Sequence, residues 1–136
     1  MSSFIHMQDD IGTIFKQIKD EKPIILFGHS MGGGLVTNFV LANPDLKLAG
    51  VILSAPFYRF PENVKMNYFK RKVLKFIAGN VPEIVIASKL SVNAIVKTTE
   101  PICSALDDVL FNKNMTLATV NALIDITLPL KQSELV

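Results

Sequence analysis

The chain has 136 residues and a mass of 15.0 kDa, and hydrophobic residues make up 49% of it. This composition excludes a disordered polypeptide, and the length fits one domain. A formal net charge of +2 is too small to indicate nucleic-acid binding by itself. One cysteine, Cys103, excludes an internal disulfide framework, and two histidines exclude a histidine-rich metal site. We therefore expect no metal, no cofactor and no nucleic-acid partner.

A run of 22 residues from Pro23 to Pro44 contains no Asp, Glu, Lys or Arg and is long enough to span a bilayer. Polar residues and three consecutive glycines interrupt this run, so its apolar residues form two patches, at 24–27 and 35–42. We therefore expect no transmembrane span. The first residues lack a basic region followed by an apolar core, so no secretory signal is indicated and a cytoplasmic protein is expected.

The first half of the chain has the pattern of an α/β protein. A helix is predicted over residues 8–21, a strand at 24–27, a helix at 35–42 and a strand at 48–54. Both strands are short continuous apolar runs, which is typical of parallel strands covered on both faces. The apolar face of the first helix is formed by Ile11, Ile14, Phe15 and Ile18. This order predicts a βαβ unit in an open α/β sheet.

After Pro56 the pattern changes, and no second βαβ unit follows. Residues 64–77 predict an amphipathic helix with lysines on one side, whereas residues 83–96 are ambiguous. Residues 102–126 predict helix in two pieces around residues 112–114. The apolar stripe of the amphipathic helix comprises Met66, Phe69, Val73, Phe76 and Ile77.

Gly28-His29-Ser30-Met31-Gly32 is a G-x-S-x-G motif between a predicted strand and a predicted helix. In this context the motif forms a nucleophile elbow, which holds the hydroxyl of Ser30 at the carboxyl edge of the sheet. We expect glycines at 28 and 32 because side chains there would collide with neighbouring backbone. The N–H of Met31, at a helix N-terminus, is a candidate oxyanion donor.

Two other interpretations of the motif carry no nucleophile. It could be a glycine-rich turn without chemistry or a phosphate-binding loop. A Walker loop would need Lys and Ser or Thr after its last glycine, but Leu35 follows Gly34.

Residues 24–56, with ILFGHSMGGGL and LAGVILSAP, resemble the elbow region of monoglyceride lipases, which are α/β-hydrolase serine lipases. Residues 57–130 resemble the start of that family's lid and include a similar Glu-Pro-Ile-Cys segment at 100–103. The resemblance implies a fragment of the α/β-hydrolase fold, with a partial core at 1–56, a helical lid at 57–130 and a tail at 131–136. It implies hydrolysis of monoacylglycerol esters, with Ser30 as nucleophile and an acylglycerol or fatty-acyl ligand.

The chain also resembles a truncated monoglyceride-lipase-like product of poxviruses, which would place it in the host-cell cytoplasm.

A catalytic triad of this fold needs an acid and then a histidine after the serine, but no histidine follows Ser30. We expect His29 to turn away and pack, and His6 to precede the first helix. The aspartates in the lid-like part are expected on solvated helix faces; they are Asp107, Asp108 and Asp125. The fold is thus expected to lack its early strands and its C-terminal acid and histidine portion, which leaves it catalytically incomplete.

Between Arg59 and Lys75 there are six basic residues and one acidic residue, Glu62. This helix could cover an acyl pocket with its lysines in water, or lie on an anionic lipid surface. The basic residues that would face lipid are Lys70, Arg71, Lys72 and Lys75. Cys103 is expected to be a packed apolar residue, since no histidine can activate it.

Three functions therefore remain open. In the first, the chain is a serine hydrolase whose catalytic histidine and acid come from a second chain or from further sequence. Alternatively, it binds an acyl chain or a membrane surface without turnover. The third alternative is a decayed gene product without activity.

Overall fold

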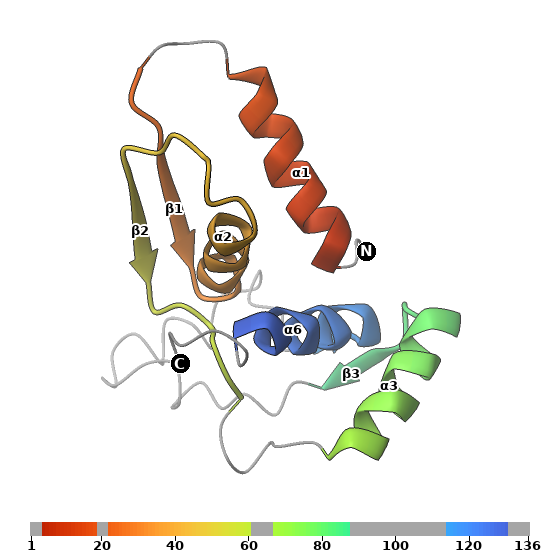
Figure 1. Cartoon of the computed structure of the whole chain (residues 1–136). Coiled ribbons are helices and arrows are strands. Elements are labelled where there is room, and N and C mark those ends of the chain that lie inside the picture. The colour runs from red at the N-terminus through yellow and green to blue at the C-terminus, as the bar shows by residue number, and fades with distance from the viewer. Residues whose placement is uncertain (1–3, 19–21, 61–66, 88–113, 131–136) are drawn as a thin grey trace, which may run out of the picture.

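The computed structural model describes residues 4–18, 22–60, 67–87 and 114–130. Two parallel strands, β1 (Ile25–His29) and β2 (Gly50–Ser54), form a sheet in which Ile25 lies opposite Gly50. The connection between them is α2 (Met31–Ala42), which packs on one face of the sheet (Figure 1). Asn43 ends this helix, because its side chain donates to the Phe39 carbonyl and Pro44 follows. The predicted βαβ unit is confirmed.

The first helix, α1 (Phe4–Gln17), lies beside α2 on the side away from the sheet (Figure 1). It begins before the predicted residue 8, and its packed side chains are Phe4, Met7 and Ile11. The predicted face is only partly correct, because Ile14 and Ile18 are exposed. The difference arises because the N-terminal half of α1 meets both α2 and α6, a contact that helical periodicity alone does not specify.

The second half of the chain forms α3 (Tyr68–Asn80), β3 (Val85–Ala87), β4 (Asn114–Thr116) and α6 (Leu117–Leu130). α3 continues past the predicted residue 77, and the side chain of Asn67 caps its start by accepting from the Lys70 N–H. β3 and β4 pair antiparallel. The prediction of helix in two pieces around residues 112–114 is wrong at 115–116, where the backbone bonds to β3, and is confirmed from Leu117 onward by α6; residues 102–113 lie outside the described part.

The core lies between α2 and α6 and is centred on Leu35 and Ile126. A buried polar contact joins the two helices, because the side-chain amide of Asn38 donates to the carbonyls of Gly34 and Ile126, at 2.8 and 3.0 Å. α6 comes from the lid-like part of the sequence, yet it completes a core with α1 and α2. Partly buried side chains around this centre are Phe4, Met7, Ile11, Met31, Phe57 and Tyr58.

The sheet face opposite α2 is exposed in the described part of the structure. Ile25, Phe27 and Ile52 are 56%, 63% and 53% exposed. The expectation that both faces are covered is wrong for the described residues, because α2 covers the side on which Gly28 lies and no other described element packs on the sheet. Two strands without such helix cover would be only marginally stable.

Within the described ranges, no helix is long and apolar enough to cross a membrane. The uncharged run from Pro23 to Pro44 is divided between β1, the turn at Ser30 and α2.

Candidate functional site: the elbow at Ser30

Ser30 lies between β1 and α2 with φ 51° and ψ −120°. A positive φ is sterically unfavourable for a residue with a side chain and persists only where the surroundings enforce it. Ser30 stands at the N-cap position of α2, but its side chain makes no capping hydrogen bond. Its hydroxyl is on an exposed residue at the carboxyl end of β1, which is the edge where open α/β sheets bind ligands.

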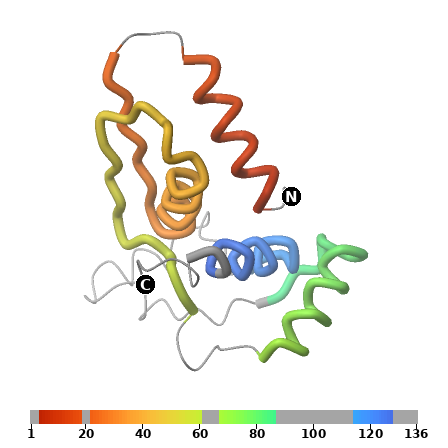
Figure 2. The backbone as a smooth tube through the Cα atoms, viewed as in Figure 1, coloured from red at the N-terminus to blue at the C-terminus, as the bar shows by residue number. Residues whose placement is uncertain are grey.

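Backbone hydrogen bonds fix this turn from both sides. The Ser30 N–H donates to the Ser54 carbonyl at 3.0 Å, and the Phe57 N–H donates to the Ser30 carbonyl at 2.8 Å. The Ser30 carbonyl also accepts from Gly33 and Gly34 in the first turn of α2. Figure 2 follows the chain from the end of β2 past the start of α2 and on toward α6. The segment after β2 thus holds the elbow in place.

The glycines around Ser30 have different roles. A Cβ on Gly28 would lie 2.6 Å from the Gly32 carbonyl oxygen, and a Cβ on Gly33 would lie 2.7 Å from Pro56. A Cβ on Gly34 would lie 2.6 Å from both Ile126 and the Phe57 carbonyl oxygen. The expected collision is therefore present at Gly28. At Gly32 it is wrong for the described part, where nothing lies within 4 Å, because this position of α2 faces away from the sheet and Pro56.

Met31 is the first residue of α2, and its side chain packs against the core. Its backbone N–H is the first of the N-terminal turn, ahead of the N–H groups that bond to the Ser30 carbonyl, and it lies at the positive end of the helix dipole. An N–H at this position, directly after Ser30, can stabilise negative charge that develops on an acyl oxygen.

The two histidines lie on different elements: His29 ends β1, and His6 lies on α1. His29 is exposed, and its Nδ1 forms a 3.1 Å hydrogen bond with the Ser54 hydroxyl. The expected packing of His29 is therefore wrong, because no described element covers the sheet face on which it lies. His6 lies within α1, and not before the first helix as expected.

The carboxylate of Asp125 has structural partners. On α6 it is 18% exposed, and it contacts Lys75 of α3 at 3.5 Å and the side-chain amide of Asn121 at 3.2 Å. The expectation of a solvated Asp125 is wrong, because α3 packs over this side of α6. Asp107, Asp108 and Cys103 lie outside the described residues. In the described ranges, no three His, Cys, Asp or Glu side chains group as metal ligands.

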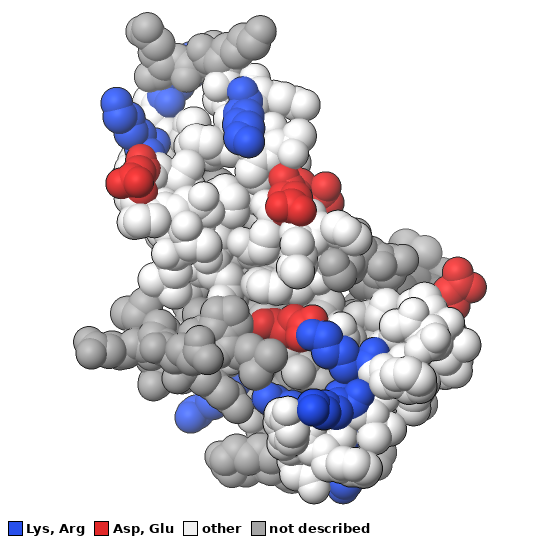
Figure 3. Space-filling view, turned by 45° about the vertical axis from the view of Figure 1, so that its right-hand side comes forward, with Lys and Arg blue, Asp and Glu red and all other residues white. Residues whose placement is uncertain are grey.

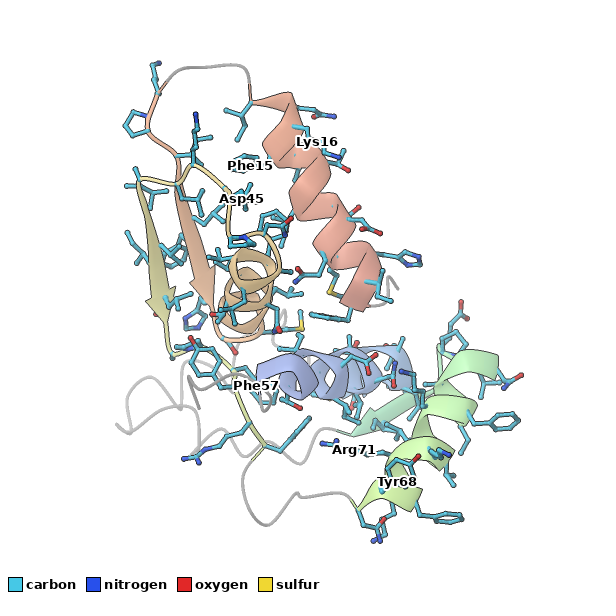
Figure 4. The ribbon with its side chains drawn as sticks, in the orientation of Figure 1. Phe15, Lys16, Asp45, Phe57, Tyr68 and Arg71 are labelled. Atoms are coloured by element: carbon cyan, nitrogen blue, oxygen red, sulfur yellow. The ribbon has the colours of Figure 1, made fainter. Side chains whose placement is uncertain are left out.

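The predicted apolar stripe of α3 faces solvent. Phe69 and Phe76 are each 73% exposed, and Val73 and Ile77 are also exposed; Met66 lies outside the described residues. α3 packs on α6, and the more buried residues of α3 include Ala78, which is buried, and Arg71, which is half-buried (Figure 4). The Nε of Arg71 is buried without a hydrogen-bond partner among the described residues.

Sequence reasoning missed Ser54, at the end of β2, and Phe57, in the segment that follows β2; both form backbone hydrogen bonds with Ser30. One signal could have identified Ser54: it ends β2 as His29 ends β1, and parallel pairing places these two residues side by side. Phe57 has no comparable signal, since its contact depends on the backbone path after Pro56.

The family model "Serine aminopeptidase, S33" (Hydrolase_4) matches residues 1–134. The chain belongs to this family. Over 76 residues, 55% of this chain and 20% of the relative, it is 36% identical to a Schizosaccharomyces pombe protein named "Putative monoglyceride lipase". The resemblance to monoglyceride lipases is thereby confirmed.

Two solved structures share the fold. A Paleococcus ferrophilus monoacylglycerol lipase superposes with a TM-score of 0.77 at 20% identity, covering 96% of this chain and 49% of that one. A soluble variant of Saccharomyces cerevisiae monoglyceride lipase, in complex with a substrate analogue, gives a TM-score of 0.69 at 18% identity, with 96% and 44% coverage. The α/β-hydrolase fold is confirmed, and this chain spans about half the length of the solved lipases.

Proposed function

We propose that this chain carries the nucleophile portion of a serine hydrolase that cleaves monoacylglycerol esters. Ser30 is the nucleophile, the N–H of Met31 is one oxyanion donor, and Gly28, His29 and Gly32 complete the elbow. The observation that carries the proposal is the backbone of Ser30, with φ 51° and a side chain that does not cap α2. The similarity to monoglyceride lipases supports the proposed substrate class.

The site as it stands is catalytically incomplete. A serine needs a base to accept its proton, and the hydrogen bond of His29 is to Ser54. We therefore propose that the histidine and the acid come from outside these 136 residues, either in a longer polypeptide or in a second chain. Loss of the general base still leaves roughly 10³-fold catalysis in related triads, through the oxyanion hole and substrate binding.

Labelling with a fluorophosphonate probe tests the role of Ser30. The purified chain is labelled alone, as the Ser30→Ala variant, and as the Thr13→Ala variant, which removes another hydroxyl from an exposed residue. We expect slow labelling that Ser30→Ala abolishes and Thr13→Ala preserves. Folded chain that remains unlabelled, or label that persists in Ser30→Ala, would contradict the nucleophile assignment.

A monoacylglycerol assay then tests completeness. We expect no sustained release of glycerol by this chain alone, because the triad base is missing. Sustained turnover that depends on Ser30 would show that the base lies within the chain and that the incomplete-site proposal is wrong.

A second function is favoured by α3, which we propose lies on an anionic lipid surface. Its exposed side carries Tyr68, Phe69 and Phe76 together with Lys70 and Lys72, and the Lys72 ammonium lies 5.0 Å from the centre of the Tyr68 ring. Figure 3 shows basic side chains gathered over this part of the molecule beside uncharged surface. Aromatic and basic residues on one exposed helix are typical of interfacial helices. Arg71 contributes less, because its Nε is buried.

Co-sedimentation with vesicles of 30% anionic lipid tests this attachment. Replacing Lys70 and Lys72 with Gln should lower the bound fraction severalfold, since each basic residue near such a surface contributes about 1 kcal/mol. The charge-matched control replaces Lys16, on α1, and Lys47, between α2 and β2, and should change binding little. Equal binding by both variants, or none by the unaltered chain, would exclude attachment through α3.

A further inference from the structure

Both strands of the parallel sheet end at an unusual backbone conformation. The non-glycine residues with positive φ in the described part of the chain are Ser30, at 51°, and Ala55, at 43°. Each directly follows the last residue of its strand, His29 for β1 and Ser54 for β2. Such conformations cost free energy and need nearby contacts to hold them.

Ser54 contacts the elbow in two ways. Its hydroxyl bonds to Nδ1 of His29 at 3.1 Å, and its carbonyl accepts from the Ser30 N–H at 3.0 Å. The parallel register places His29 and Ser54 opposite each other, with their side chains on the same face of the sheet. The contact therefore links the two strand ends at the residues that precede the two positive φ angles.

We infer that the His29–Ser54 hydrogen bond is a clamp that positions the backbone of Ser30. In this assignment His29 is a positioning residue that acts through Ser54, and it takes no part in proton transfer with Ser30. The clamp keeps the Ser54 carbonyl in place for the Ser30 N–H, and it thereby fixes the elbow at its β2 side. The Phe57 N–H, which donates to the Ser30 carbonyl, fixes the other side.

Hydrogen exchange of the Ser30 amide, followed by NMR, tests the clamp without any need for activity. Ser54→Ala and His29→Phe each remove the side-chain bond, and each should speed exchange at Ser30 by about five- to tenfold, the effect of losing one hydrogen bond. Ser54→Thr retains the hydroxyl and should restore slow exchange. Thr13→Ala, which removes a hydroxyl bond on α1, should leave the Ser30 rate within about twofold of its original value.

The double variant separates a clamp from unrelated damage. If the two side chains act only through each other, His29→Phe with Ser54→Ala should exchange no faster than either single variant. The inference would be overturned if the increases in the Ser30 exchange rate caused by the two substitutions multiplied in the double variant. It would also be overturned if neither single variant changed that rate. Thermal unfolding followed by circular dichroism shows whether each variant folds. If one single variant lacks a cooperative unfolding transition, the exchange rate of the other single variant tests the clamp.

The effect on Ser30 reactivity rests on the proposed function, whereas the exchange rates do not. If Ser30 reacts with the fluorophosphonate, labelling should slow in Ser54→Ala and recover in Ser54→Thr. Normal exchange behaviour without labelling of the unaltered chain would contradict the nucleophile assignment and leave the clamp supported. If Ser30 is labelled but its amide exchanges at the same rate in Ser54→Ala and His29→Phe as in the unaltered chain, the nucleophile assignment is supported and the clamp is contradicted.

Discussion

α2 and α3 have similar lengths, 12 and 13 residues, and both carry apolar side chains, yet they bury different fractions of them. α2 lies between the sheet, α1 and α6, and half of its residues are buried. α3 contacts α6 on one side, and Ala78 is its buried residue. The more amphipathic of the two sequences thus has the exposed apolar face. Periodicity identifies a face on each helix, but a neighbouring element determines whether it is covered.

Truncating one apolar side chain in the α2–α6 core and one on the exposed face of α3 should give the largest difference in the free energy of unfolding. Ile126→Ala removes a fully buried side chain from the α2–α6 core and should lower the free energy of unfolding by about 3 kcal/mol. Phe76→Ala on α3 removes a larger but exposed side chain and should change it by less than about 0.5 kcal/mol. Urea denaturation of both variants provides the measurement. Similar losses would mean that the exposed face of α3 packs against something in solution.

Alanine substitutions at two glycines of the motif should change the stability of the chain in opposite directions. Gly28→Ala would place a Cβ 2.6 Å from backbone oxygen and should destabilise the chain by about 2 kcal/mol or more. Gly32→Ala meets open space in the described part of α2 and should stabilise it by about 0.5 kcal/mol through helix propensity. Thermal unfolding distinguishes them. A destabilising Gly32→Ala would indicate a contact that the described residues lack.

Asn38→Ala tests the polar link inside the core. It removes the amide that donates to the carbonyls of Gly34 and Ile126, so the Ile126 carbonyl loses a buried donor. The expected loss is about 1.5 kcal/mol, measured by urea denaturation. Thr37→Val, one residue earlier on α2, removes the partly buried contact between its hydroxyl and that of Tyr58 and serves as the control. A loss for Asn38→Ala no greater than for this control would mean that the link contributes little.

The smallest effect is expected for the ion pair that joins α3 to α6. Lys75→Met removes the 3.5 Å contact with Asp125, but Lys75 is 67% exposed. Water screens such a pair, so the change in unfolding free energy should stay below about 0.5 kcal/mol and shrink further in 1 M salt. Lys70→Met, also exposed on α3, is the comparison. A loss above about 1 kcal/mol for Lys75 alone would show that this pair anchors α3.

The sequence by itself determined the order of elements in the first half of the chain and the position of the elbow. Continuous apolar runs, a glycine-rich segment and the Asn43-Pro44 stop are local signals, and they predicted the order and type of β1, α2 and β2 correctly. The bounds differ, because α2 begins at Met31 and not at residue 35, so that the glycines at 32–34 belong to the helix. The G-x-S-x-G spacing predicted the turn at Ser30, where the structure shows a positive φ. These features depend on residues close together in the chain, and so a local pattern is sufficient to identify them.

Only the tertiary structure decided which faces are buried and which residues support the elbow. The contacts of Ser54 and Phe57 with the elbow, the steric role of Gly33 against Pro56, and the burial of Ile126 against α2 all join segments distant in sequence. The same holds for the exposed stripe of α3 and for the ring of His29. Burial depends on what packs against a side chain, and the sequence of one segment does not specify its neighbour.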